Sequence, residues 1–310
     1  MPRCRGKNET KRKTAMSTVN RIKGSITALI TPMKDGKLDE AAFRKLVSWQ
    51  IAEGSDGLVP CGTTGESPTL SHDEHRRVIE ICVEETAGRV PVIAGAGSNS
   101  TAEAIELTKF AKSVGCDAVL SVTGYYNKPS QEGQYRHFMA VADAVEIPII
   151  LYNIPPRAIV EISVETMARL AQHPNIIGVK DATANLMRPS RERHVIGKNW
   201  LLLSGEDGTA LAYNAHGGHG CISVTANVAP RLCAQFQALC RQRDFEGALS
   251  IQDRLLPLHD ALFTNPNPAP VKYAASKLGL CSDEVRLPLV EADDAARAAV
   301  DKAMAFAGLK

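Results

Sequence analysis

The sequence predicts an α/β protein, namely a (β/α)8 TIM barrel with a C-terminal helical appendage. Eight short runs rich in valine, isoleucine and leucine recur as far as residue 227, and a segment with helical periodicity separates each run from the next. The runs are continuously apolar rather than alternating, which is typical of parallel strands covered by helices. Eight consecutive strand–helix units close naturally into a barrel.

The eight predicted strands all end near glycine or polar residues. In chain order they are ITALITP from Ile26, GLVPCGTTG from Gly57, VPVIAGAG from Val90, AVLSVTG from Ala118, PIILYNIP from Pro148, IIGVKDA from Ile176, WLLLSGED from Trp200 and GCISVTAN from Gly220. After residue 228 the strand signals stop, and the remaining segments have helical periodicity. We therefore expect a catalytic barrel over residues 20–243 and a helical region over residues 244–310.

The segments between the strands carry helix signals. In LDEAAFRKLVSWQIAEG and STAEAIELTKFAKSVG, apolar residues recur at i, i+3, i+4 and i+7, with Ser or Asp near the start and Gly at the end. A doubly wound open sheet is the alternative fold. It requires a phosphate-binding glycine loop, and the one candidate, GAGSN at 95–99, lacks the third glycine of GxGxxG.

Composition and charge narrow the class of protein. The chain is 44% hydrophobic and 23% charged with a net charge of +2, which indicates a globular protein with an aliphatic core and no nucleic-acid footprint. The basic residues of segment 1–19 precede no apolar run, so we expect no secretory signal, no membrane span and a cytoplasmic location. Segment 1–19 is interpreted either as a disordered tail or as an upstream extension before Met16.

The cysteines and histidines predict neither disulfides nor a metal. The eight cysteines are spread without any CxxC pair, so reduced and mostly buried thiols are expected. His216 and His219 stand three residues apart in HGGHG, but their flanking glycines indicate a turn that enters a strand.

Polar residues at the C-terminal ends of the strands are the candidate site residues, because barrel active sites lie at that rim. These residues are Thr63, Thr64, Glu66, Tyr125, Tyr126, Tyr152, Asn153, Arg157, Lys180, Asp181, Glu206, Asp207, Ser223 and Thr225. Lys180 is the strongest candidate, because four residues of apolar strand deliver it to the barrel mouth. Burial disfavours a charged amine, so Lys180 could act as a nucleophile there.

Hydroxyl groups near Lys180 suit proton transfer. Tyr152, on the preceding strand, could shuttle protons to a carbinolamine, and Thr63 with Tyr126 could connect it to solvent. The Thr64 hydroxyl and the backbone N–H groups of the GTTGE turn suit a carboxylate. Any one of these hydroxyls alone could equally be a satisfied strand-end hydrogen bond, and only their joint occurrence favours function.

A series of segments from about Gly24 to Leu309 resembles the pyruvate-dependent class I aldolases of the N-acetylneuraminate lyase superfamily, and within them the dihydrodipicolinate synthase family. The segments are GSITALITPM, GTTGES, LSHDEH, PVIAGAGSN, YYNKPSQEG, LYNIPPR, IIGVKDAT, LLSGED, GGHGCISVTAN and NPNPAPVKYA. Two positions depart from the family pattern: Gly124 replaces a proline before the tyrosine pair, and Asp181 replaces the commoner glutamate.

The resemblance implies a lyase that condenses pyruvate with L-aspartate 4-semialdehyde to give 4-hydroxy-tetrahydrodipicolinate, the first committed step of diaminopimelate and lysine biosynthesis. It implies a Schiff base on Lys180, proton transfer by Tyr152, and a relay completed by Thr63 and by Tyr126 from a neighbouring subunit. The substrate contacts that it implies are those of Thr64, Arg157, Ile222 and Gly205. No cofactor is expected beyond the covalent lysine–pyruvate imine, and a homotetramer built as a dimer of dimers is expected.

Arg157 separates the synthases from the sialic acid lyases that share the lysine and the GTTGE-like turn. A guanidinium pairs bidentately with the carboxylate of the semialdehyde, whereas a polyol sugar chain has no comparable group. Two alternatives stay open: another pyruvate-dependent aldolase, similar to N-acetylneuraminate lyase, and a barrel that binds a keto acid without turnover.

The resemblance also implies an inhibitory site for L-lysine at a subunit interface. A carboxylate can hold the α-ammonium group of an amino acid, and an amide with a tyrosine hydroxyl can bind its carboxylate. The matching positions here are Ser67, Pro68, His72, His75, Asn99, Glu103 and Tyr125. By spacing alone, the histidines and Glu103 could equally be helix-start residues on solvated faces.

Overall fold

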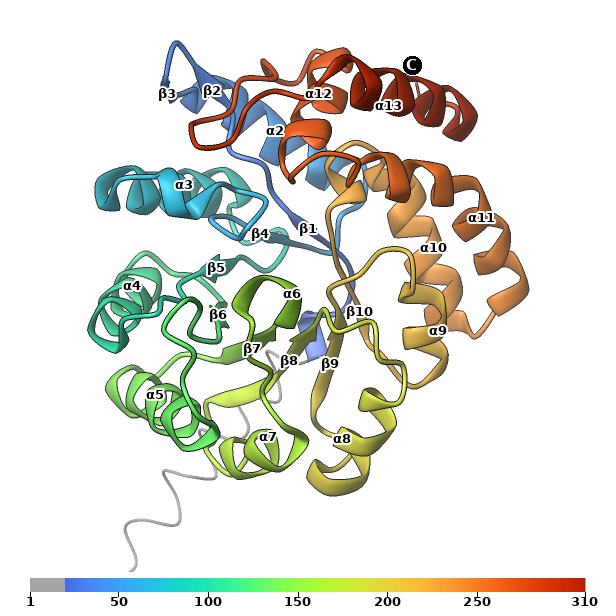
Figure 1. The fold of residues 1–310 in the computed structure, drawn as a ribbon. Helices are drawn as coiled ribbons and strands as arrows, with labels where there is room; N and C mark the ends of the chain where they lie inside the picture. The colour runs from blue at the N-terminus through green and yellow to red at the C-terminus, as the bar shows by residue number, and fades with distance from the viewer. Residues whose placement is uncertain (1–19, 310) are drawn as a thin grey trace, which may run out of the picture.

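The computed structural model describes residues 20–309, and its main feature is one sheet of eight parallel strands. The strands are β1 (Gly24–Ala28), β4 (Gly57–Val59), β5 (Ile93–Gly95), β6 (Ala118–Val122), β7 (Ile149–Asn153), β8 (Ile176–Asp181), β9 (Leu201–Ser204) and β10 (Gly220–Ser223). Each pairs with its neighbours in the order β4-β1-β10-β9-β8-β7-β6-β5. A bridge from Leu58 to Val92 and the bond from the Gly95 N–H to the Pro60 carbonyl, 2.9 Å, join β4 to β5. The predicted barrel is confirmed (Figure 1).

A ring of helices surrounds the barrel, one after each strand (Figure 1). They are α2 (Glu40–Ala52), α3 (His72–Thr86), α4 (Thr101–Ser113), α5 (Gln131–Ala144), α7 (Val164–Leu170), α8 (Arg188–Ile196), α9 (Ala210–Ala215) and α10 (Pro230–Gln242). The helix-start signals operate as expected: Asp39 caps α2, and Ser71 with Glu74 forms a capping box on α3. Side chains therefore satisfy the first backbone N–H groups of α2 and α3, whereas Ser100 at the start of α4 makes no such bond.

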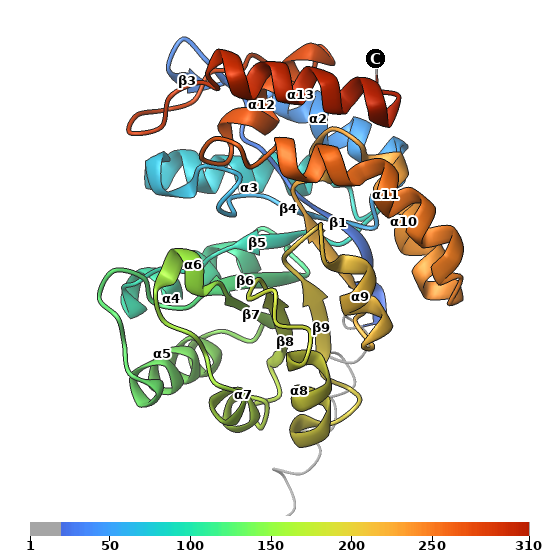
Figure 2. The same ribbon diagram turned by 45° about the vertical axis from the view of Figure 1, so that its right-hand side comes forward.

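Three further helices, α11 (Phe245–Ala261), α12 (Ala269–Lys277) and α13 (Asp294–Ala307), follow the barrel. α11 lies beside α10, and α12 with α13 lies on the side of α2, as the orange and red segments of Figures 1 and 2 show. Among residues 20–309, no helix combines the length and the apolarity needed to cross a membrane.

Several short elements were not predicted. They are the hairpin β2 (Met33–Lys34) with β3 (Lys37–Leu38), the 3₁₀ turns η1 (Ser67–Thr69) and η2 (Thr225–Asn227), and the single-turn helix α6 (Pro155–Ala158). The hairpin turns at Asp35 and Gly36, whose φ angles of 52° and 74° suit a tight two-residue loop. Strands of two residues are too short to leave an alternating pattern in the sequence.

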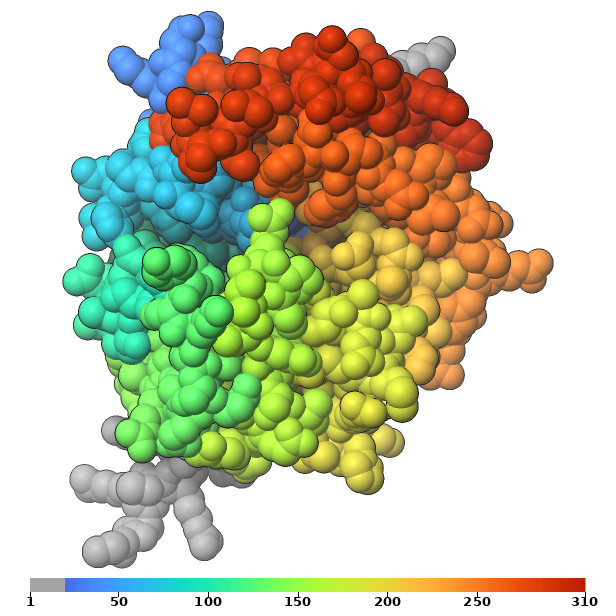
Figure 3. All heavy atoms as spheres, viewed as in Figure 1, coloured from blue at the N-terminus to red at the C-terminus, as the bar shows by residue number. Residues whose placement is uncertain are grey.

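The core has two layers, as expected for a closed barrel. One apolar cluster lies outside the strands, beneath the helices. A second fills the barrel interior, and its members include Ile26, Val59, Ile93, Leu120, Ile150, Tyr152, Ile177, Leu203 and Ile222. Figure 3 shows the face above this interior hollowed between cyan, lime and orange segments.

A bulge in β8 determines which way its last residues point. Ile149 pairs with Ile176 but Ile150 pairs with Gly178, so β8 holds one extra residue between these pairs. Ile177 belongs to the interior cluster, and strict alternation from there would turn residue 180 outward. Instead Lys180 pairs with the interior residue Tyr152. The bulge therefore directs the amine of Lys180 into the barrel.

Candidate active site

Lys180 and Tyr152 lie face to face at the rim of the barrel interior. The Lys180 Nζ atom is 4.3 Å from the centre of the Tyr152 ring, and the two residues are only 5% and 6% exposed. Among the described residues, no carboxylate lies within ion-pair distance of Lys180. A buried amine without a counter-ion differs from an ordinary structural lysine, which is either solvated or paired.

Gly205 makes room for the Lys180 side chain. A Cβ atom at position 205 would lie 2.9 Å from Lys180 Cε, closer than a real contact allows. The next residue, Glu206, is also near the amine. Burial raises the pKa of Glu206 and the neighbouring Asp207 acts in the same direction, while Lys180 lowers this pKa. The end of β9 thus contributes space and a carboxyl group to the rim.

The GTTGE turn follows β4 and carries two of the predicted residues. Thr64 is buried, Thr63 is half-buried, and the Glu66 N–H closes the turn on the Thr63 carbonyl at 3.2 Å. Within residues 20–309, the backbone N–H groups of Thr63 and Thr64 have no hydrogen-bond acceptor. Buried N–H groups are normally paired, so this turn has donors free for a ligand.

The turn is held by the C-terminal helical region, which the sequence argument did not connect to the site. Lys272 of α12 forms a fully buried ion pair with Glu66 at 2.6 Å, and the Arg286 N–H donates to the same carboxylate at 3.1 Å. Because its amine is paired with Glu66 and 0% exposed, Lys272 differs from Lys180, the other lysine that is buried within residues 20–309. The only sequence signal was its place in NPNPAPVKYA, far along the chain.

Of the other residues predicted to contact substrate or relay protons, one is buried and two are exposed. Ile222 is buried in the barrel interior. Arg157, on α6, is exposed and forms no ion pair with any residue of the described range. Tyr126 is 90% exposed with φ 68°. One chain therefore brings together Lys180, Tyr152, Gly205 and Ile222 but leaves the Tyr126 phenol in solvent, and it does not by itself form the predicted relay.

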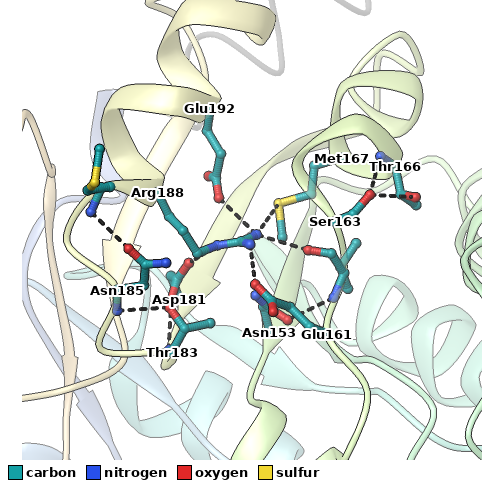
Figure 4. A network of polar contacts seen from close by, with 12 residues as sticks. Asn153, Glu161, Ser163, Thr166, Met167, Asp181, Thr183, Asn185, Arg188 and Glu192 are labelled. Atoms are coloured by element: carbon teal, nitrogen blue, oxygen red, sulfur yellow. Dashed lines mark hydrogen bonds and ion pairs between the residues drawn. The ribbon is translucent and has the colours of Figure 1, made fainter.

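A buried network of charges lies behind the end of β8 (Figure 4). The Arg188 guanidinium donates to Asp181 at 2.8 Å, contacts Glu192 at 3.2 Å and pairs with Glu161. Asp181 also accepts from the Thr183 hydroxyl at 2.6 Å. Asp181, one of the two departures from the family pattern, thus anchors the strand end that carries Lys180. Arg188 had no sequence signal.

We predict that Glu192 makes the stability of the protein depend on pH. Burial raises the pKa of Glu192 from 4.5 to about 7 and the negative charge of Asp181 acts in the same direction, while the Arg188 guanidinium opposes both. Between those values the folded state holds a proton that the unfolded state releases, so stability falls as pH rises through this window.

The measurement is denaturant unfolding of wild type and Glu192→Gln at pH 5 and pH 8. From pH 5 to pH 8, the free energy of unfolding of wild type should fall by roughly 1 to 3 kcal/mol more than that of the variant. An equal difference between the proteins at both pH values would contradict the assignment of the proton to Glu192.

The two histidines of HGGHG have separate partners. His216 Nδ1 lies 3.3 Å from the Ser190 hydroxyl, and His219 Nδ1 accepts from the Leu202 N–H at 3.1 Å. Within the part of the chain that the structure describes, no group of three or more His, Cys, Asp or Glu side chains is arranged to hold a metal ion.

The residues predicted to bind L-lysine surround a second cavity, of about 260 Å³, beside η1 and the start of α3. All of them except Asn99 line it, together with Leu70, Gly97 and Leu107. Asn99 Nδ2 donates to the Tyr125 carbonyl at 3.3 Å and so lies next to the lining. Glu103 accepts from Ser98 and lies 3.3 Å from His72 Nε2.

His75 connects this cavity to the barrel. Its Nε2 bonds the Gly95 carbonyl at 2.8 Å, and because a carbonyl only accepts, Nε2 carries the proton. Burial lowers the pKa of His75, which favours the neutral ring. The His75 carbonyl in turn accepts from the Cys61 thiol at 3.4 Å, two residues before Thr63.

A buried lysine amine that pairs with no described carboxylate and lies beside a tyrosine, at the rim of a (β/α)8 barrel, defines a class: a barrel enzyme suited to nucleophilic amine chemistry. A model of the Dihydrodipicolinate synthetase family matches residues 21–307. The chain belongs to that family, which confirms the resemblance drawn from its motifs.

Known relatives agree over nearly the whole chain. The chain is 69% identical to 4-hydroxy-tetrahydrodipicolinate synthase of Parvibaculum lavamentivorans over 93% of its length and 99% of that protein. A dihydrodipicolinate synthase from Acinetobacter baumannii complexed with pyruvate superposes with a TM-score of 0.91 at 44% identity, over 93% and 100% of the two chains. A synthase of Cyanidioschyzon merolae with lysine bound superposes with a TM-score of 0.90 at 38% sequence identity, and the match covers 93% of this chain and 99% of that one.

Proposed function

We propose that the protein condenses pyruvate with L-aspartate 4-semialdehyde to give 4-hydroxy-tetrahydrodipicolinate, and that Lys180 carries the covalent intermediate. The buried Lys180 amine against Tyr152, with no ion-pair partner within residues 20–309, carries this proposal, because imine formation needs a nucleophilic amine with a proton donor beside it. The relative complexed with pyruvate supports the identity of the first substrate.

The reaction follows from the groups at the rim. The Lys180 amine attacks the ketone carbon of pyruvate, and Tyr152 protonates the departing hydroxyl, so that water leaves and an imine forms. Tyr152, which has given up its proton, takes a methyl proton to give an enamine. The enamine carbon attacks the aldehyde carbon of the semialdehyde, and the proton passes from Tyr152 to the aldehyde oxygen. The amino group of the second substrate finally attacks the imine carbon, closes the ring and releases Lys180 as a free amine.

Binding of the two carboxylates is assigned to two parts of the rim, the turn after β4 and helix α6 after β7. The Thr64 hydroxyl with the free N–H groups of the GTTGE turn receives the pyruvate carboxylate, and Ile222 supplies an apolar contact. Arg157 receives the carboxylate of the semialdehyde, which favours the synthase over a lyase of the N-acetylneuraminate type. Its guanidinium has no protein counter-ion within residues 20–309, so it is available to a substrate anion.

The exposed Tyr126 supports an assembly of several chains. A phenol that is 90% exposed cannot relay protons within a buried site of its own chain. We assign it to the site of a neighbouring subunit, where it joins Thr63 and Tyr152 in the relay, within a homotetramer arranged as a dimer of dimers.

The test of the function is a product assay. Purified protein is incubated with pyruvate and L-aspartate 4-semialdehyde, and the cyclic product is followed by mass spectrometry, with N-acetylneuraminate offered separately. Formation of the product supports the synthase. Cleavage of N-acetylneuraminate in its absence would instead assign the chain to the lyases, and no turnover of either would leave a binding protein.

We further propose that L-lysine binds in the second cavity and inhibits the enzyme. Glu103 offers a carboxylate to the α-ammonium group, and Tyr125 with Asn99 offers donors to the lysine carboxylate. Inhibition requires that the ligand distinguish two states of the protein, and the contacts of His75 with Gly95 and Cys61 link this cavity to the active-site rim. The relative with lysine bound supports the choice of ligand.

We predict that Glu103→Ala raises the lysine concentration for half-inhibition about 10- to 100-fold, because the lysine ammonium loses its charged partner. Calorimetric titration and inhibition curves measure this. Glu106→Ala, one turn further along the exposed face of α4, is the matched control and should leave inhibition unchanged. Unaltered inhibition in Glu103→Ala, or no heat from lysine in wild type, would show that lysine does not use this cavity.

A further inference from the structure

The segment that precedes α12 reaches the GTTGE turn through one buried hydrogen bond. Asn267 Nδ2 donates to Thr64 Oγ1 at 3.0 Å, although the residues are 203 positions apart in sequence. Both side chains are buried, with Asn267 6% and Thr64 3% exposed. This segment belongs to NPNPAPVKYA, a motif to which the proposed reaction assigns no task.

We propose that Asn267 is a positioning residue that orients the Thr64 hydroxyl as a donor to the substrate carboxylate. The inference rests on the proposed function, in which the GTTGE turn binds that carboxylate. A hydroxyl has one proton and two lone pairs. Because Thr64 Oγ1 accepts from Asn267, its own proton remains free, and no other described residue accepts it.

The surrounding contacts hold this arrangement from the same side. Glu66, two residues after Thr64, adopts a left-handed conformation with φ 55° and is held by Lys272 and Arg286. The C-terminal region therefore contacts the turn at both Thr64 and Glu66. This reduces the freedom of the turn to re-orient its donors when the ligand leaves.

Asn267 also has an unsatisfied atom. Its Oδ1 is buried and has no hydrogen-bond donor within residues 20–309. Such an atom costs stability, so an asparagine here is poorly explained by packing alone. A carboxamide at this position is explained if its N–H group serves to donate to Thr64 Oγ1.

The experiment measures the pyruvate concentration for half-maximal trapping with borohydride, together with kcat. Asn267→Ala should raise the half-maximal concentration about 5- to 30-fold while kcat changes by less than about 2-fold, since the hydroxyl can then rotate away. Asn265→Ala is the matched control: this asparagine bonds Asp293 at the start of α13 instead, with atoms at 3.0 and 3.1 Å, and its loss should leave both constants unchanged.

Two further variants separate orientation from structural support. The carboxylate of Asn267→Asp has the same shape as the carboxamide but can only accept hydrogen bonds, so it should draw the Thr64 proton away from the substrate. Pyruvate binding should therefore weaken by more than in Asn267→Ala, and it should recover in part at low pH, where the carboxyl group is protonated. In a Thr64→Val background, Asn267→Ala should have no further effect on the pyruvate constant. An unchanged effect in that background, or an Asn267→Asp variant equal to wild type, overturns the inference. If wild type itself traps no pyruvate, the proposed function fails instead.

Discussion

Lys180→Arg should abolish pyruvate trapping and lower kcat/KM by at least about a thousand-fold, because a guanidinium does not deprotonate in proteins and cannot form the imine. The substitution keeps a basic side chain of similar length beside Tyr152. Loss of activity would therefore report on the amine itself. The measurements are peptide mass analysis after borohydride reduction with pyruvate, and steady-state kinetics with both substrates.

Lys272 and Lys128 are the informative comparisons for this prediction. Lys272 is equally buried, but its amine is engaged by Glu66 at 2.6 Å and is inaccessible. Lys128 is exposed in the loop before α5, and Lys128→Arg should behave as wild type. A reduced pyruvyl group found on the peptide of Lys272 or Lys128 would show that the nucleophile is assigned to the wrong lysine.

Arg157→Ala should lower kcat/KM for L-aspartate 4-semialdehyde about 30- to 1000-fold, because the substrate carboxylate loses its bidentate partner. This factor corresponds to a loss of transition-state stabilisation on the order of 2 to 4 kcal/mol. Trapping of pyruvate on Lys180 should remain close to wild type, since that step precedes binding of the semialdehyde. Arg157 is exposed and forms no ion pair within residues 20–309, so its truncation should change the melting temperature little.

Arg157→Lys refines this result. A lysine keeps the charge but not the planar fork, so we expect an intermediate loss for the semialdehyde. Full synthase activity in Arg157→Ala would remove this residue from the site. It would also remove the main physical argument that separates this chain from the sialic acid lyases.

Local patterns in the sequence were enough to predict the order of the strands and helices. Apolar runs such as IIGVKDA and WLLLSGED became β8 and β9, and helix-capping signals such as Ser71 with Glu74 became the first turn of α3. These features depend on neighbouring residues alone, and local periodicity reports them directly. Polar residues at strand ends could therefore be named as candidates before the structure was known.

The orientation of those candidates was decided by packing. Alternation along β8 would have turned Lys180 outward, and the bulge at Ile177, where the register against β7 shifts, directs it inward. No periodicity encodes one extra residue in a single strand. The same holds for Tyr126, whose place after β6 suited the rim but whose side chain the folded chain leaves 90% exposed.

By itself, then, the sequence determined the barrel, the strand that carries the lysine and the family to which the chain belongs. Only the tertiary structure decided that Lys180 has no counter-ion within residues 20–309 while Lys272 has one, that Arg188 holds Asp181, and that Asn267 contacts Thr64. Arg188 and Asp181 lie seven positions apart. The other two contacts join residues about 200 positions apart along the chain. Such pairings depend on how close-packed elements meet in space, and so no local pattern records them.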